Sequence, residues 1–200
     1  MNNTSLANND SKNDGRRLRR IRSREMIKAA IHELIYSGNY SPLATDIAQK
    51  TQLSIRTVFR NIDDMDSLTR EIASDLENQV LPIYLKPYET TTWRKQLDEL
   101  VQNRCKIYEI IFPVRVSLSL RRFRSEYLKS VYERIFELER ASLQTILPKS
   151  ILEDDITFAA LNTTISSLTW INLRLDQHYN AQKSQNILQH QVNCLVKQFE

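Results

Sequence analysis

The chain has 200 residues, of which 41% are hydrophobic and only two are glycine, and its formal net charge is +4. This length allows one or two globular domains with a core, and the scarcity of glycine excludes most strand-and-hairpin architectures, which need turn glycines. Two isolated cysteines exclude a disulfide framework and a CxxC metal pair, and they favour a reducing cytoplasm. We therefore expect an all-α, cytoplasmic protein.

The positive charge is concentrated near the N-terminus. Residues 16–62 carry ten Lys and Arg against three Asp and Glu, and six of these ten are the arginines between residues 16 and 24. Such an asymmetry is typical of a module that meets a polyanion. The first fifteen residues are polar and lack the apolar stretch of a signal peptide. We expect residues 1–22 to form a flexible basic arm, with a merely solvated arm as the alternative.

Short helices separated by capping signals follow this arm. The apolar residues recur at helical spacing, glycine stands where a helix would end, and serine stands where helices would begin. The sequence predicts a first helix that ends at Gly38, a second from Ser41 to about Thr51, a third from Ser54 to about Asn61 and a fourth from "DDMDS" to Pro82.

The rest of the chain predicts longer helices divided by prolines. We expect helices over about 92–112, a short one in "PVRVSLSLRRF", and others over about 125–147, 153–178 and 181–199. The last two have little sequence between them and should lie as antiparallel neighbours. The uncharged stretch from Ile156 to Leu173 holds too many polar groups for a membrane span, so no membrane partner is expected. In total the pattern predicts about nine helices.

The pair of short helices within "TDIAQKTQLSIRTVFRNI" predicts a helix-turn-helix. Helices of about eight residues are too short to be stable alone, so they must pack on their neighbours. In a helix-turn-helix the second helix lies in the DNA major groove with its N-terminal residues at base edges. Leu53 and Val58 are the expected core contacts, which leaves arginine, threonine, serine and asparagine side chains to reach bases and phosphates.

Residues 24–68 resemble the DNA-binding domain of the tetracycline-repressor (TetR) family of bacterial transcription regulators. The resemblance runs through Asp-Ile-Ala at 46–48, through the apolar-Ser-x-x-Thr-apolar-aromatic-basic run at 53–60, and through Leu68. The positions that match in the first helix and after it are Ile27, Ala29, Ala30, Leu34 and Gly38. The matching residues cover about 45 positions in unbroken register, which is more specific than a generic helix-turn-helix.

The resemblance implies a three-part organisation. Residues 1–22 would be the arm, residues 23–68 the helix-turn-helix domain, and residues 69–200 a helical regulatory domain for ligand binding and dimerisation. The DNA-binding residues expected from pattern and resemblance together are Arg16, Arg17, Arg19, Arg20, Arg24, Thr45, Ser54, Ile55, Arg56, Thr57, Phe59, Arg60 and Asn61.

Three positions depart from the family's usual pattern. Gln52 stands at the turn where glycine is usual, Phe59 where tyrosine is usual, and Met65 where lysine is common. A residue other than glycine in a left-handed turn costs about 1 to 2 kcal/mol, and the other two changes each remove a phosphate contact. We hypothesise that the basic arm compensates, along the DNA backbone or in a minor groove. Phe59 could instead be a core residue.

The resemblance further implies a ligand-responsive regulator of transcription. Such a protein is usually a repressor that leaves a palindromic operator in double-stranded DNA when an effector binds its C-terminal domain. It would be a homodimer that pairs through its last two helices, with apolar surface from the row Ile187, Leu188, Val192, Leu195 and Val196 and from the uncharged stretch. No cofactor is implied.

Aromatic side chains at helical spacing in the second half could line the effector cavity, although aromatics in this pattern are more often plain core. The four arginines in "RVSLSLRRFR" could favour an anionic effector, with a solvated helix end as the alternative. The candidate ligand-binding residues are Trp93, Tyr108, Phe112, Arg115, Phe123, Tyr127 and Trp170.

Other classes of function have less support. A DNA-binding architectural or cell-division factor on the same fold, without an effector, remains an alternative. An enzyme is not expected, because no Ser-His-Asp, paired-carboxylate or glycine-loop pattern stands out. His190 and Cys194 are four residues apart on one helix, but two ligands do not make a metal site.

Overall fold

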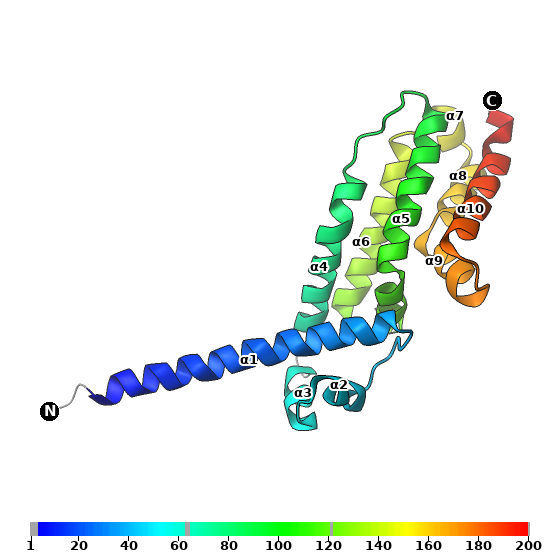
Figure 1. The fold of residues 1–200 in the computed structure, drawn as a ribbon. Helices are drawn as coiled ribbons and strands as arrows, with labels where there is room; N and C mark the ends of the chain where they lie inside the picture. The colour runs from blue at the N-terminus through cyan, green and yellow to red at the C-terminus, as the bar shows by residue number, and fades with distance from the viewer. Residues whose placement is uncertain (1–3, 63–64, 121, 200) are drawn as a thin grey trace. The chain divides into compact units, whose positions relative to one another are not determined.

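The computed structural model describes residues 4–62, 65–120 and 122–199, and within these ranges it leaves out the side chains of residues 4–14, 16, 62, 65, 66, 69 and 124. The described chain is all-helical, as the sequence predicts, with ten α-helices and no strand (Figure 1). The helices are α1 (Thr4–Tyr36), α2 (Ala44–Thr51), α3 (Ile55–Ile62), α4 (Met65–Tyr84), α5 (Trp93–Ser119), α6 (Glu126–Gln144), α7 (Lys149–Leu152), α8 (Asp155–Thr164), α9 (Ser167–Ile171) and α10 (Ala181–Val196).

The chain divides into two compact units, Met1–Ala73 and Ser74–Glu200, so the division falls inside α4. The sequence placed it slightly earlier, between residues 68 and 69. We refer to these as the first unit and the second unit. The two acids at 63 and 64, which were expected in the first turn of the fourth helix, lie outside the described residues.

The first unit is built on the C-terminal half of α1. This half buries Ile27, Ile31 and Ile35, and α2 and α3 both pack against it (Figure 1). α2 contributes Ile47 to the core, and α3 contributes Val58, which is fully buried. Burial of these side chains is what stabilises two helices of eight residues, because propensity alone could not.

The expected basic arm is helical in the described residues. Residues 4–22 continue α1 as one uninterrupted helix that extends beyond α2 and α3 (Figure 1). The physical reason is cooperativity, since the buried segment from Ile27 onward provides a nucleus and each further residue adds a hydrogen bond without a new nucleation cost. The run between residues 16 and 26 contains mostly arginine, leucine, isoleucine and methionine, which have adequate helix propensity.

The second unit is a bundle around α5. Its core includes Leu97 and Val101 of α5, Leu143 of α6, and Trp170 of α9. α10 packs against α5 and α8, as expected for neighbouring helices at the end of the chain (Figure 1). Because Leu188, Val192 and Val196 are buried in this packing, they cannot supply dimer surface, and that part of the sequence-based interface is wrong.

Two helix boundaries of the second unit differ from the prediction. α5 does not end at Phe112 but continues through Pro113 to Ser119. Proline inside a helix costs about 3 kcal/mol or more. Pro113 and Val114 are both buried, and this burial offsets part of that cost. Tertiary packing therefore overrides the local stop signal.

The single helix expected over 153–178 is instead divided. α8 ends at Thr164, and Ser166 caps α9 by accepting a hydrogen bond from the Thr169 N–H at 3.3 Å. The freed carbonyl oxygen of Ile165 accepts from Arg104 Nη1 at 3.1 Å and from the Tyr108 hydroxyl at 2.9 Å. Side chains from α5 thus satisfy the backbone at the break. No helix in the described residues is long and apolar enough to cross a membrane.

Candidate nucleic-acid interface

The turn between α2 and α3 is closed without glycine. Gln52 adopts the left-handed conformation, with φ of 57° and ψ of 22°. Its side-chain amide donates to the carbonyl oxygen of Gln49 at 2.7 Å, and the Leu53 N–H lies 3.4 Å from Thr51 Oγ1. The turn therefore has the backbone geometry that the resemblance expects, held by a strained residue and by local side-chain hydrogen bonds.

Asp46, rather than Ser41, organises the start of α2. The helix begins at Ala44, so the expected cap at Ser41 is wrong. Asp46 Oδ2 accepts from the Leu43 N–H at 2.9 Å and from the Asn39 amide at 3.1 Å. A carboxylate that reaches back to the N-cap N–H satisfies one of the unpaired donors at a helix start, which gives the Asp-Ile-Ala motif a structural role.

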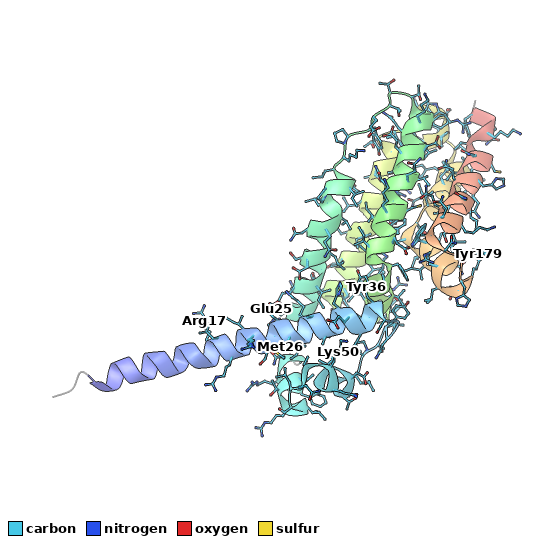
Figure 2. The ribbon with its side chains drawn as sticks, in the orientation of Figure 1. Arg17, Glu25, Met26, Tyr36, Lys50 and Tyr179 are labelled. Carbon is cyan, nitrogen blue, oxygen red and sulfur yellow. The ribbon has the colours of Figure 1, made fainter. Side chains whose placement is uncertain are left out.

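A surface ion pair links α2 to α1. Lys50 Nζ lies 2.7 Å from Glu33 Oε2, and Figure 2 shows Lys50 on α2. The hydrogen bond from the Lys50 ammonium lowers the pKa of the Glu33 carboxyl below its ordinary value. The pair is exposed to solvent, so its contribution is to orientation more than to stability.

α3 presents most of its predicted side chains outward. Ser54 caps the helix by accepting from the Thr57 N–H at 3.2 Å, as predicted. Arg56 and Arg60 are exposed and lie four residues apart, on the face opposite Val58. Ile55 and Phe59 are 46% and 53% exposed, so the alternative that Phe59 is a core residue is wrong. Thr45, at the start of α2, is also exposed.

Asn61 and Thr57 differ from the rest of the predicted α3 surface. Asn61 is only 5% exposed, and its amide donates to the Thr57 carbonyl oxygen at 2.8 Å. The outward position expected for Asn61 is therefore wrong, since three residues after Val58 the helix still faces the core. Thr57 is half-buried, and its hydroxyl lies 2.9 Å from that of Ser54.

The arginines of α1 fall into two groups. Arg17, Arg19 and Arg20 are exposed, and Figure 2 shows Arg17 on the part of α1 that extends beyond α2 and α3. Arg22 is exposed as well, although the predicted set omitted it. The Arg16 side chain lies outside the described ones.

Arg24, by contrast, packs within the first unit. Its Nε donates to Glu71 Oε1 at 2.8 Å and its Nη2 donates to Ser67 Oγ at 2.7 Å, both on α4. Its guanidinium therefore already has an anionic partner, and its place in the structure is to join α1 to α4. The signal that could have separated it from the other arginines is its position one turn before the buried Ile27.

The seven predicted ligand-binding residues do not gather in one place. Tyr108 and Trp170 are core residues, with ring centroids 6.5 Å apart. The Tyr108 hydroxyl lies within hydrogen-bond distance of Ile165 O and Glu139 Oε1, and burial raises its pKa well above the ordinary value. Phe123 is 85% exposed, so it lies on the surface. The half-buried members are Trp93, Phe112 and Tyr127, and Arg115 is buried.

Two open depressions lie at the C-terminal end of α10. One of about 680 Å³ is lined by Arg94, His190, Asn193, Cys194 and Lys197, and the other, of about 580 Å³, shares Cys194 and Lys197 with it. Neither is lined by a predicted ligand-binding residue. His190 Nε2 and Cys194 Sγ are 3.7 Å apart, and within the described residues no group of three or more His, Cys, Asp or Glu could hold a metal ion.

Comparison with known proteins finds a similar fold but no similar sequence. No protein-family model matches the chain, and no curated protein matches its sequence. Its structure is similar to the crystal structure of a transcriptional regulator from Rhodococcus sp. Rha1, with a TM-score of 0.62 and 16% sequence identity. The likeness covers 87% of this chain and 96% of that one. The two proteins share a fold.

Glycine at position 52 should stabilise the protein. We expect Gln52→Gly to raise the free energy of unfolding by about 1 kcal/mol, because glycine adopts the left-handed conformation without the clash of a Cβ atom. Urea denaturation followed by circular dichroism measures the change.

The matched control is Gln49→Gly, the same substitution at an exposed, right-handed helical position of α2. It should lower the free energy of unfolding by about 1 kcal/mol. Equal losses from both variants would show that the turn stores no strain at Gln52.

Proposed function

We propose that this chain is a DNA-binding regulator of transcription of the tetracycline-repressor type. The observation that carries the proposal is the exposed face of α3, where Arg56 and Arg60 project from a short helix that is anchored by the buried Val58. The fold shared with a transcriptional regulator from Rhodococcus supports the same reading.

The recognition face has the side chains that major-groove contacts use. Arg56 lies in the first turn of α3, the part of a recognition helix that approaches base edges, and arginine pairs with guanine through two hydrogen bonds. Arg60, one turn later, has the reach for phosphate. Ile55 and Phe59 add exposed apolar surface beside them, which suits the methyl group of thymine.

The helical extension of α1 supplies a second basic surface. Its four exposed arginines, Arg17, Arg19, Arg20 and Arg22, are available to phosphates. Such contacts are sequence-independent and depend strongly on salt. In this proposal the extension adds affinity while α3 supplies sequence preference, which offsets the phosphate contacts that Phe59 and Met65 do not make.

The proposed regulator acts as a homodimer on a roughly palindromic operator. Support for a self-association surface comes from α8 and α9, where Ile156 and Leu168 are 83% and 54% exposed within the uncharged stretch. The outward face of α10 is more polar, with Lys183, His190 and Asn193 exposed. We therefore place the pairing surface on α8 and α9 more than on α10.

Control by a small molecule completes the proposal. An effector bound to the second unit would favour one of two arrangements of the protein and so release the operator, as a repressor does, with a coupling free energy set by its preference for that arrangement. The cytoplasm is the expected compartment.

Fluorescence anisotropy tests the central claim. We expect the full-length protein to bind duplex DNA from upstream of its own gene more tightly than a scrambled duplex, at two salt concentrations. A preference that persists at the higher salt supports an operator-reading regulator. Weak and equal binding that disappears with salt would contradict it and would favour the architectural alternative.

Substitutions on α3 separate base reading from phosphate contact. Arg56→Ala should cost about 1 to 3 kcal/mol of binding free energy and relax specificity at one base pair. Arg60→Ala should weaken binding to all sequences alike and lower the salt slope by about 1. The measurement is the same titration against a set of operators with single base changes, and identical, sequence-independent losses would refute the role of Arg56.

The extension of α1 is tested by removing its charge but not its helix. Replacing Arg17, Arg19, Arg20 and Arg22 together by glutamine keeps a similar helix propensity. The salt slope should fall by about 0.9 for each arginine that contacts a phosphate, while the preference for operator over scrambled DNA is retained. As a control, Lys149→Gln in the second unit should leave the slope unchanged, and an unchanged slope in the fourfold variant would exclude a DNA role for the extension.

A further inference from the structure

Arg115 of α5 is a buried cation with no carboxylate partner among the described residues. Its side chain belongs to a residue only 8% exposed, and its Nε has no hydrogen-bond partner. In the part of the chain that the structure describes, no ion pair joins Arg115 to a carboxylate. Burying a guanidinium without an anion or a full set of acceptors is unfavourable. A bound anion would therefore stabilise Arg115 in its buried position.

A second buried arginine on the same helix shows what a structural arginine looks like here. Arg104 is 6% exposed, and its guanidinium donates to the carbonyl oxygens of Ile165 and Glu139 and to Ser142 Oγ. These acceptors account for its burial. Arg115 has no comparable set, so the same explanation does not apply to it.

A second guanidinium lies close to Arg115. The Cζ atom of Arg115 is 4.5 Å from the centroid of the Tyr132 ring on α6, and the Cζ atom of Arg122 is 5.0 Å from the same centroid. The Tyr132 hydroxyl donates to the carbonyl oxygen of Arg115 at 2.8 Å, which fixes the ring. Burial raises the pKa of Tyr132, while the charges of Arg115 and Arg122 act to lower it. The positively charged side chains of Arg115 and Arg122 therefore both lie against the Tyr132 ring.

Exposed apolar side chains flank this pair of cations. Phe123 is 85% exposed and its ring lies 4.6 Å from the Arg122 Cζ atom. Leu120, at the end of α5, is 61% exposed, and Phe136, one turn after Tyr132 on α6, is 49% exposed. Arg122 itself is only half-buried, so the cluster is reachable from the surface.

We propose that Arg115 and Arg122 bind the carboxylate of a small organic acid, whose apolar body packs on Phe123 and its exposed apolar neighbours. A guanidinium presents two parallel N–H donors that match the two oxygens of a carboxylate. The apolar surface beside it favours an acid with a hydrocarbon body over an inorganic anion. This inference rests on the proposed function for its regulatory meaning, because the acid would be the effector.

The experiment uses octanoate as the probe, octan-1-ol as its uncharged analogue and inorganic phosphate as the purely anionic one. Calorimetric titration and thermal unfolding are measured on the full chain without DNA. The variants are Arg115→Met and Arg122→Gln. The matched control is Arg134→Gln, because Arg134 is an exposed arginine of α6 that lies two residues after Tyr132 in the sequence. Arg104→Met represents a structural arginine.

We expect octanoate to bind the wild-type protein and raise its melting temperature, and octan-1-ol and phosphate to bind much more weakly. Arg115→Met should weaken octanoate binding by about tenfold or more, Arg122→Gln should weaken it by less, and Arg134→Gln should leave it unchanged. Without ligand, Arg115→Met should melt no lower than wild type, because an apolar side chain replaces an unpaired buried charge. Arg104→Met should melt lower.

Several results would overturn the proposal. These are no octanoate binding to the wild type, equal binding by all variants, phosphate binding as tight as octanoate, or a loss of stability in Arg115→Met as large as that in Arg104→Met. If Arg115→Met does not fold, Arg122→Gln against Arg134→Gln decides the question.

The failure of this inference and that of the proposed function can be told apart. Operator binding by a protein that does not bind octanoate would remove the inference and leave the function. Arg115-dependent octanoate binding by a protein without operator preference would remove the proposed function and leave the binding site. Both stand if octanoate lowers the affinity of the wild type for operator DNA and has no such effect on Arg115→Met.

Discussion

A helix of eight residues is not stable by itself, and the first unit is organised by that constraint. α2 and α3 exist because Ile47 and Val58 are buried with the isoleucines of α1. Anchoring each short helix through one face leaves the opposite face free, and on α3 this free face carries Arg56 and Arg60. The same packing gives α1 a stable core segment, from which the helix continues through the arginine-rich sequence to Thr4. Folding and exposure of the basic surfaces therefore have a common origin.

The turn between these helices shows how a departure from a family pattern can be accommodated. Gln52 takes the left-handed conformation that glycine would take at lower cost, and its side chain donates back to Gln49. The cost of about 1 to 2 kcal/mol is small against the burial of several apolar side chains, each of which contributes about as much. The turn that presents α3 therefore keeps its backbone geometry, and the strain at Gln52 lowers the free energy of unfolding.

The second unit contrasts two buried arginines of α5. Arg104 bridges the break between α8 and α9 to α6, and its donors are met by acceptors within the chain. Arg115 lies eleven residues further along the same helix, near Arg122 and the Tyr132 ring, and within the described residues it forms no ion pair with a carboxylate. Arg104 therefore has a structural role, whereas Arg115 is the arginine that we propose to bind an external carboxylate. This difference is invisible in the sequence, where both are arginines within a predicted helix.

The sequence by itself determined the helical class, the positions of α2 and α3, the cap at Ser54 and the identity of the exposed basic residues on α3. These follow from local rules, namely apolar spacing, capping side chains and the scarcity of glycine, which act over a few residues. Only the tertiary structure decided that the N-terminal arm is helical, that α5 passes through Pro113, that the uncharged stretch is broken at Ser166, and that Arg24 and Asn61 face inward. The helical arm depends on the segment of α1 that follows it, which is held by burial against α2 and α3. Each of the others depends on residues from elsewhere in the chain: the core of the second unit around Val114, the hydrogen bonds that reach Ile165 from α5, Glu71 for Arg24, and the core of the first unit for Asn61. Because such long-range contacts outweigh local preferences of about 1 kcal/mol, they could not be read from the residues around each position.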